Sequence, residues 1–303
     1  MTRLAHFSDI HLNIRPAGWT LRDRLTKRIF GWSNLYVMGR AKRFRHAPRV
    51  LEALRREFET HSFDHLIFSG DSCMLAFDAE FERAAQSLPL TQWPGIAVPG
   101  NHDYYLPSVV TNRRFEHYFA PWLKGQRMDD EHIYPFAQKV GHLWLIAVNS
   151  SRPNFWNWDA SGAVGPQQRE RLRQLLATLE PGPRILVTHY PALMENGHPE
   201  PFWHQLRDWR EMLEVAAQGG ISLWLNGHRH HGYLCNPTID MPFPLICAGS
   251  TTQTNRWSYN DYHIEGTHLT AVRRQYHFED ERFVDWQRFE LDLPVASMET
   301  PPS

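Results

Sequence analysis

Five short motifs in the sequence combine aspartate, asparagine and histidine, and each follows an apolar run of the length expected for a strand. The motifs are Asp9-Ile10-His11, Gly70-Asp71, Gly100-Asn101-His102-Asp103, His189 and Gly227-His228-Arg229-His230. Carboxylate oxygen, amide oxygen and imidazole nitrogen suit borderline to hard divalent metals, and the lack of cysteine among them argues against a structural zinc site. The motifs therefore indicate a metal centre.

Carboxylates also allow two metals to share one site. A carboxylate can bridge two cations and hold them roughly 3.5–4 Å apart, as in two-metal hydrolytic sites. Two such metals lower the pKa of a bridging water and bind the oxygens of a phosphorus centre during in-line attack. His228 and His230 are two positions apart in the last motif, so each could reach a different metal.

The elements that carry these motifs alternate between strand and helix. Short apolar runs predict strands at 4–8, 65–69, 95–98, 143–149, 184–188, 222–226 and 245–248, and helical patterns lie at 48–59, 77–86, 166–179 and 202–218. This alternation predicts an α/β layered domain, and the runs at 262–264, 268–273 and 283–291 are typical of antiparallel strands. In an open α/β sheet, ligands bind beyond the carboxyl ends of the strands. The five motifs are therefore expected to meet at one rim.

The overall composition excludes several classes of protein. The chain has 303 residues, with 32 Lys+Arg against 33 Asp+Glu, and this near-neutrality argues against a globally basic nucleic-acid binder. Its three cysteines form no CxxC pair, and no run approaches the roughly 20 apolar residues that span a bilayer. The first residues lack the pattern of a signal peptide. We expect a cytoplasmic protein with a single domain over residues 1–295 and a loose tail at 296–303.

Charge is unevenly distributed, because the segment 15–49 holds ten basic residues and one acid, Asp23. Aromatic residues such as Trp19, Phe30 and Trp32 alternate with these bases at spacings compatible with an amphipathic helix. The segment is therefore predicted to be a basic, aromatic helical insertion. One interpretation is a solvated helical face packed on the domain. The other is a surface for an anionic partner, either a phosphorylated ligand or the periphery of a membrane rich in anionic lipid.

The series of motifs from Asp9 to His230 resembles the calcineurin-like metallophosphoesterase superfamily. The resemblance implies a four-layer α/β/β/α sandwich of two mixed sheets around two metal ions, which are manganese, iron or zinc. It assigns the first ion to Asp9, His11, Asp71 and His230, and the second to Asp71, Asn101, His189 and His228. It also implies that a hydroxide bridging the two metals attacks phosphorus in line, while His102 stabilises the phosphoryl group and helps to protonate the leaving oxygen.

One position departs from the family pattern. Many members continue as Gly-Asp-x-x-Asp, where the second carboxylate orients the catalytic histidine, but this chain has Met74 there. Either another acid such as Asp78 or Asp103 orients His102, or this histidine is less constrained.

The form of the motifs is most similar to the class III phosphodiesterases, whose substrates include cyclic nucleotides and glycerol-type phosphodiesters. One alternative is a pyrophosphohydrolase of a nucleotide-activated lipid, similar to the UDP-2,3-diacylglucosamine hydrolases. The basic segment and the tryptophan-rich loop 154–158 favour it, although the common form of that enzyme has arginine in place of His102. A second alternative is a non-catalytic scaffold of the same fold. The candidate substrate contacts are Arg152, Trp156 and Arg229.

Overall fold

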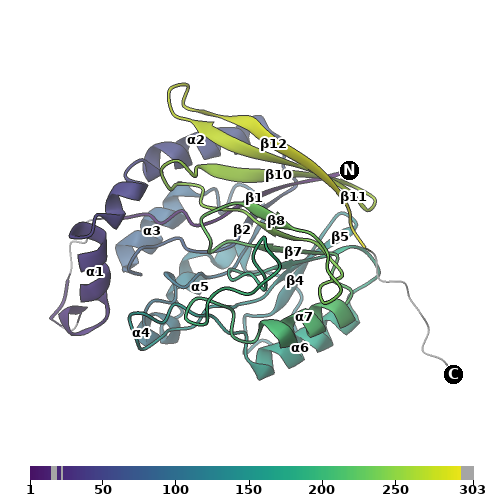
Figure 1. Cartoon of the computed structure of the whole chain (residues 1–303), viewed down its shortest axis with the longest axis horizontal. Helices are drawn as coiled ribbons and strands as arrows, with labels where there is room; N and C mark the ends of the chain where they lie inside the picture. Colours follow the sequence, from purple (N-terminus) through teal and green to yellow (C-terminus); the bar gives the residue numbers. More distant parts are fainter. Residues whose placement is uncertain (15–18, 22, 295–303) are drawn as a thin grey trace.

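The computed structural model describes residues 1–14, 19–21 and 23–294, whose longer strands form two six-stranded sheets (Figure 1). The first sheet has the order β12-β11-β10-β1-β2-β3, with β1 (Thr2–Phe7), β2 (His65–Phe68), β3 (Gly95–Ala97), β10 (Ser258–Glu265), β11 (His268–His277) and β12 (Arg282–Asp292). The second has the order β4-β5-β6-β7-β9-β8, with β4 (Phe136–Val140), β5 (Leu143–Ala147), β6 (Arg184–Val187), β7 (Leu223–Asn226), β8 (Tyr233–Cys235) and β9 (Leu245–Cys247). Each sheet combines parallel and antiparallel pairs, so both are mixed, as predicted.

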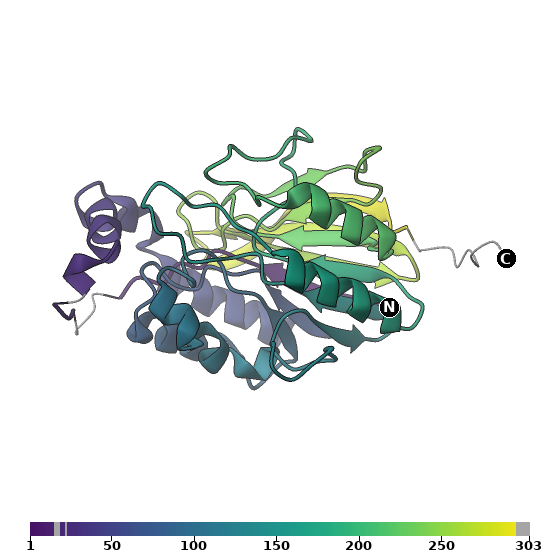
Figure 2. The same ribbon diagram turned by 90° about the horizontal axis from the view of Figure 1, so that it is seen from below.

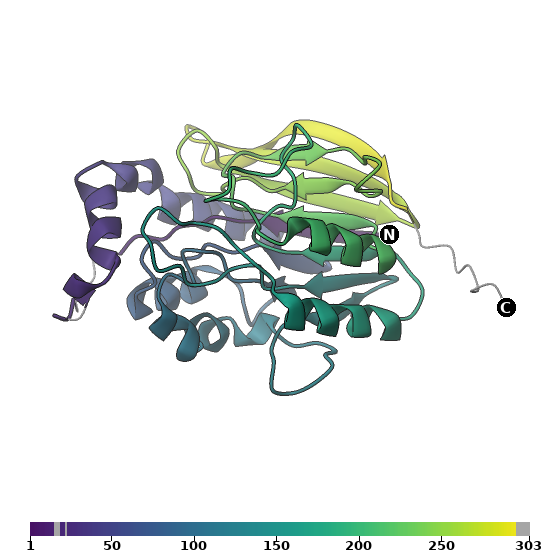
Figure 3. The same ribbon diagram turned by 60° about the horizontal axis from the view of Figure 1, so that its bottom comes forward.

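Helices cover the outer face of each sheet, which gives the molecule four layers (Figures 2 and 3). The longer helices are α2 (Ala47–Thr60) and α3 (Asp78–Ser87) on the first sheet, and α6 (Pro166–Thr178) and α7 (Trp209–Gln218) on the second. The shorter ones are α4 (Pro107–Thr111), α5 (Arg114–Tyr118) and η3 (Ala120–Trp122). Among the described residues, no helix is long and apolar enough to cross a membrane.

The second sheet is buried on both faces. Leu145 and Ile185 belong to the core between the sheets, whereas their neighbours Ile146 and Leu186 pack in the core beneath α6 and α7. Successive side chains of a strand point to opposite faces, so a strand covered on both sides is an unbroken apolar run in the sequence. Such runs predicted the inner strands. Edge strands β4 and β8 were not among the predictions; β4 includes the polar residues Gln138 and Lys139.

One predicted helix is much shorter than expected. Of the predicted range 202–218, only Trp209–Gln218 (α7) is helical. The preceding residues pair with another loop instead: Gly162 N donates to Gln205 O at 3.1 Å, and Arg207 N donates to Gly162 O at 2.9 Å. The carboxylate of Asp208 also accepts hydrogen bonds from the backbone of residues 164 and 165. These long-range contacts outweigh the local helical pattern.

The basic segment is not one amphipathic helix. Its described residues form η1 (Asp23–Leu25), α1 (Arg28–Tyr36), η2 (Arg40–Phe44) and the first turn of α2. Helix α1 ends at Tyr36, and Gly39, which directly precedes η2, adopts a left-handed conformation (φ 78°). Helix α1 projects from one end of the molecule (Figure 1). Arg15 and Arg22 of the basic segment, and the predicted tail at 296–303, lie outside the described residues.

Arg28 attaches this segment to the body of the protein. Its buried guanidinium donates to the carboxylate of Asp23 and to the carbonyl oxygens of Leu75 and Ala76 in the loop after β2. It also lies 4.0 Å from the centre of the Phe77 ring. The single acid of the segment is therefore used in an internal contact.

We expect Arg28→Ala to lower the free energy of unfolding by about 3 kcal/mol, because it leaves the largely buried carboxylate of Asp23 without its charged partner. Urea unfolding followed by tryptophan fluorescence measures this change. Arg24→Ala is the matched control, since Arg24 is exposed in η1, the short helix that contains Asp23. Equal stabilities of the two variants would show that Arg28 does not anchor the segment.

Candidate metal centre

The predicted ligands follow strands of both sheets at the point where each strand ends. β1 leads to Asp9 and His11, β2 to Asp71, β3 to Asn101, β6 to His189, and β7 to His228 and His230. The strands β1, β2 and β3 are parallel, as are β6 and β7 in the other sheet. Their carboxyl ends lie at one rim, and the structure brings all seven side chains together there.

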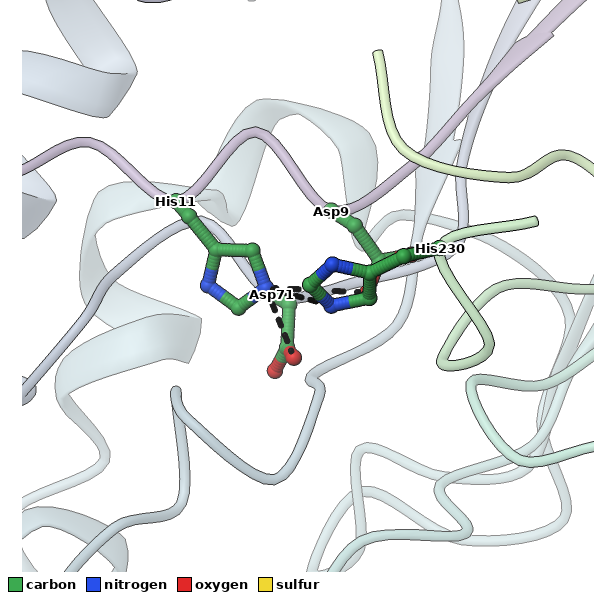
Figure 4. A group of neighbouring side chains, drawn as sticks. All are labelled: Asp9, His11, Asp71 and His230. Carbon is green, nitrogen blue, oxygen red and sulfur yellow. Dashed lines mark hydrogen bonds and ion pairs between the residues drawn. The ribbon is translucent and has the colours of Figure 1, made fainter. Parts of the chain in front are cut away.

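Asp9, His11, Asp71 and His230 form the first group, in which one ligand atom of each residue lies within 4.8 Å of the others (Figure 4). The Nε2 atoms of His11 and His230 are 3.0 Å apart. Asp9 Oδ1 is 3.7 Å from Nε2 of His11 and 3.2 Å from Nε2 of His230. The four side chains converge on a common centre.

Asn101, His189 and His228 form a second group that shares Asp71 with the first. Asn101 Oδ1 is 3.2 Å from His189 Nε2 and 3.1 Å from His228 Nδ1. Asp71 Oδ2 is 3.5 Å from His189 Nε2 and also 3.5 Å from His11 Nε2. This carboxylate oxygen therefore lies between the two groups.

Hydrogen bonds on the outer side of the rings show which nitrogens carry protons. His11 Nδ1 donates to the carbonyl oxygen of Cys73 at 3.0 Å, and His189 Nδ1 donates to the carbonyl oxygen of Ser69 at 2.7 Å. His230 Nδ1 donates to the amide oxygen of Gln253. Because a neutral imidazole has one N–H, Nε2 of each ring carries a lone pair.

These lone pairs face other lone pairs. His11 Nε2 faces His230 Nε2, and His189 Nε2 faces the amide oxygen of Asn101, with no proton on the histidine nitrogens to join them. The buried Asp9 Oδ1 accepts no hydrogen bond among the described residues. Acceptors held this close repel one another unless a cation lies between them. The donor set thus fits metal ions.

Burial sets the charge state of several of these groups. Burial lowers the pKa of His11 to about 4 and that of His189 to about 3, so both rings are neutral at pH 7, as ligands must be. Burial and the negative charge of Asp9 raise the pKa of Asp71 well above its usual range. Two carboxylates in one buried site are a further reason to expect a cation.

Backbone strain is concentrated at the same residues. Nine non-glycine residues of the described chain have positive φ, and five of them are candidate ligands: Asp9 (52°), His11 (39°), Asp71 (61°), His228 (70°) and His230 (53°). Such conformations cost about 1 kcal/mol or more each and cluster at functional sites. The loop after β2 and the loop after β3 also lie very close together. A Cβ added to Gly100 would clash with the carboxylate of Asp71.

A backbone carbonyl orients His102. Its Nδ1 donates to the carbonyl oxygen of Met74 at 2.7 Å, so the residue that replaces the family carboxylate still holds the ring, through its main chain. The expectation that Asp78 or Asp103 orients His102 is therefore wrong. Asp78 instead forms an ion pair with Arg114.

Asp103 fastens the loop after β2 to the loop after β3. Its carboxylate accepts hydrogen bonds from the backbone N–H groups of Asp71, Ser72, Cys73 and Gly100. This buried carboxylate therefore positions the backbone that carries the candidate ligands, and among the described residues it accepts no hydrogen bond from the His102 side chain.

Arg40 contacts His102 of the candidate site, although the sequence analysis distinguished it only as one of the ten basic residues of 15–49. Its Nη2 donates to His102 Nε2 at 3.1 Å. Burial and the positive charge of Arg40 lower the pKa of His102 well below its usual range, so the ring is neutral with its proton on Nδ1. Burial also lowers the pKa of Arg40, and the carboxylate of Asp71 opposes that shift.

Glu200 is a second residue that the sequence did not reveal. Its buried carboxylate lies 3.2 Å from Nε2 of His228 and also accepts a hydrogen bond from Arg229. The Nδ1 atom of the same ring lies 3.1 Å from Asn101 Oδ1. Arg229, a candidate substrate contact, is engaged by Glu200, and the neighbouring His231 contacts Arg256 outside the cluster.

A cavity of about 580 Å³ adjoins the second group, and its lining includes Asn101, His102 and Arg40. Of the candidate substrate contacts, Arg152 belongs to the described lining, whereas Trp156 and Arg229 do not. Trp156 instead stacks on Trp158, which does line the cavity, with 4.9 Å between ring centroids. Lys27 also lines it, and burial lowers the pKa of Lys27 to about 8.

Known proteins share this fold and part of this sequence. The chain is 25% identical over 248 residues to the 3',5'-cyclic adenosine monophosphate phosphodiesterase CpdA of Escherichia coli (strain K12). The aligned region covers 74% of this chain and 78% of the relative. A dimetal phosphatase from Danio rerio superposes with a TM-score of 0.66 at 12% identity, over 96% of this chain and 99% of that one. PhoD superposes with a TM-score of 0.62 at 9% identity, over 99% of this chain and 72% of that one. These structural likenesses show the fold.

The model of the calcineurin-like phosphoesterase family matches residues 2–232, a range that contains all five motifs and most of the chain. The matched range also includes the four side chains that form the first group of donors. The chain therefore belongs to the calcineurin-like phosphoesterase family and is a metal-dependent phosphoester hydrolase.

Proposed function

We propose that the protein is a phosphodiesterase that uses two metal ions and binds its substrate in the cavity beside His102. The observation that carries the proposal is the place of Asp71 Oδ2, which is 3.5 Å from Nε2 of both His11 and His189. One carboxylate oxygen can thus serve two sets of donors. The first ion would be held by Asp9, His11, Asp71 and His230, and the second by Asp71, Asn101, His189 and His228.

Bound ions of this kind supply positive charge to phosphoryl oxygens and activate water as a nucleophile. The chain itself contributes Arg40 and His102, which line the cavity next to the ligand Asn101. A guanidinium pairs well with phosphate oxygens, so we assign Arg40 to a phosphoryl oxygen. When Arg40 turns from His102 to the substrate, Nε2 of His102 becomes free to hold a proton for the leaving oxygen.

The size and lining of the cavity favour a diester. A volume of about 580 Å³ is far more than one phosphate group fills and lies in the range of small-molecule sites. Arg40, Lys27 and Arg152 supply positive charge, and the rings of Tyr105 and Trp158 supply apolar surface. A phosphate with an organic group on each side would use both. The name of the relative CpdA, a cyclic AMP phosphodiesterase, also supports a diester.

A pyrophosphohydrolase of a nucleotide-activated lipid is the second candidate. Phe30, Met38 and Trp158 line the cavity and are also 61%, 80% and 58% exposed. An acyl chain could cover such side chains, which a small polar diester would leave in water.

A substrate panel tests the proposal. We expect metal-free protein to be inactive and to regain activity with manganese. We also expect it to hydrolyse bis(p-nitrophenyl) phosphate, cyclic nucleotides or a glycerophosphodiester at least about tenfold faster than p-nitrophenyl phosphate. A preference for the monoester would contradict the proposal, and a preference for a UDP-acylsugar would support the second candidate.

Replacing Glu200 tests the second group of donors. Glu200→Gln removes the charge that orients His228, so we expect metal affinity at the second position to fall by about 10- to 100-fold. Metal content and the manganese dependence of turnover measure this loss. Glu195→Gln is the control, since Glu195 is an exposed acid of the same loop that contacts His231. If both variants bind metal like the original protein, the role of Glu200 is refuted.

Replacing Arg40 tests the phosphoryl contact. Arg40→Gln keeps a donor near His102 but removes the charge, so kcat/KM for a soluble diester should fall by about a hundredfold. Metal content should not change. The control is Arg43→Gln, because Arg43 is exposed in the same short helix η2. A loss of metal together with activity would mean that Arg40 supports the metal centre instead.

A further inference from the structure

Large hydrophobic side chains that reach water are concentrated in three segments that contain or adjoin residues lining the cavity. Sixteen such side chains are exposed in the part of the chain that the structure describes, and seven lie in 21–38, three in 155–158 and two in 202–203. We name these three segments the apolar rim. Surfaces of monomeric proteins rarely carry large contiguous apolar patches, so such a concentration marks an interaction surface.

The three segments adjoin one another. Lys27 Nζ donates to the carbonyl oxygen of Asn154 at 3.0 Å, which joins the first segment to the tryptophan-rich loop. Ala160 N donates to the carbonyl oxygen of Trp203 at 2.8 Å, which joins that loop to the third segment. Phe30 and Trp158 line the same cavity. The first segment includes α1, which stands out at one end of the molecule (Figures 1 and 3).

The side chains of the rim are those that enter a lipid interface. Leu25 is 90% exposed and Phe155 is 84% exposed, and Trp32, Trp156 and Trp203 are also exposed. Tryptophan and phenylalanine place an apolar ring at the boundary between headgroups and acyl chains. Hydrophobic contact with acyl chains would remove these side chains from water.

Positive charge accompanies the rim. Arg24, Lys42 and Arg43 are exposed in or next to the first segment. Asp23, the one acid of 15–49, is buried and bound to Arg28, so it does not offset them. Bases beside exposed leucine and tryptophan are typical of surfaces that lie on anionic lipid.

We propose that the apolar rim and the cations beside it form a docking surface for a membrane that contains anionic phospholipid. Docking would place the mouth of the cavity at the level of the headgroups. The inference does not depend on the proposed reaction, because vesicle binding can be measured without substrate.

Co-sedimentation of the full chain with vesicles tests the proposal. We expect binding to phosphatidylcholine vesicles that contain phosphatidylglycerol, weaker binding to phosphatidylcholine alone, and weaker binding at high salt. Leu25→Ser/Phe155→Ser should weaken binding by about tenfold or more, through lost apolar burial. Lys42→Gln/Arg43→Gln should weaken it about tenfold on anionic vesicles only.

Matched controls remove the same kinds of side chain elsewhere. Ile239→Ser/Trp286→Ser deletes exposed apolar groups outside the rim, and Arg173→Gln/Arg288→Gln deletes exposed cations on α6 and β12. Both controls should bind vesicles like the original protein. Every variant should keep its activity on a soluble diester, because none of these side chains lines the cavity.

Two results would overturn the proposal. One is the absence of binding to anionic vesicles at low salt. The other is equal vesicle binding by rim variants and controls. Self-association that the rim variants lose, without vesicle binding, would assign the rim to contacts between copies of the chain.

Discussion

Unprotonated nitrogens and oxygens that face one another around Asp71 are the feature on which the rest of the site depends. The Nε2 atoms of His11 and His230 lie 3.0 Å apart without a proton between them, and Asp71 and Asp9 share the same buried space. Five candidate ligand residues also have strained backbone. Each of these costs free energy in the protein alone, and a cation would offset the repulsion. The two packed cores must supply the stability that holds such a site in place.

One loop orients three histidines of the site through its main chain. The carbonyl oxygens of Ser69, Cys73 and Met74 accept hydrogen bonds from His189, His11 and His102, respectively. Asp103 holds the same loop through its N–H groups. A carbonyl group is present whatever the side chain is, which explains how methionine can stand where many relatives have a carboxylate.

The basic segment is joined to this loop as well. Arg28 binds the carbonyl oxygens of Leu75 and Ala76, directly after Met74. Residues of α1 line the cavity, and Arg40, which follows α1, donates to His102. The segment therefore takes part in the site, and its charge is divided between the cavity and the exposed surface. Neither of the two sequence-based interpretations of the segment included a contact with His102.

Local patterns in the sequence predicted the candidate ligand residues and the inner strands, because polar metal donors at strand ends and unbroken apolar runs are compact signatures. Arg40, Glu200 and Gln253 have no such signature: each acts on a histidine at least 23 positions away, so only the path of the chain brings them together. The role of Met74 could not be predicted either, because every residue has a backbone carbonyl group and the residue type does not show which one orients a histidine. The path of the chain also decides the conformation of 202–208, where pairing with a distant loop overrides a helical pattern. The residue types of the candidate site could be predicted from the sequence, whereas the orientation of its side chains and the residues around them depend on tertiary contacts.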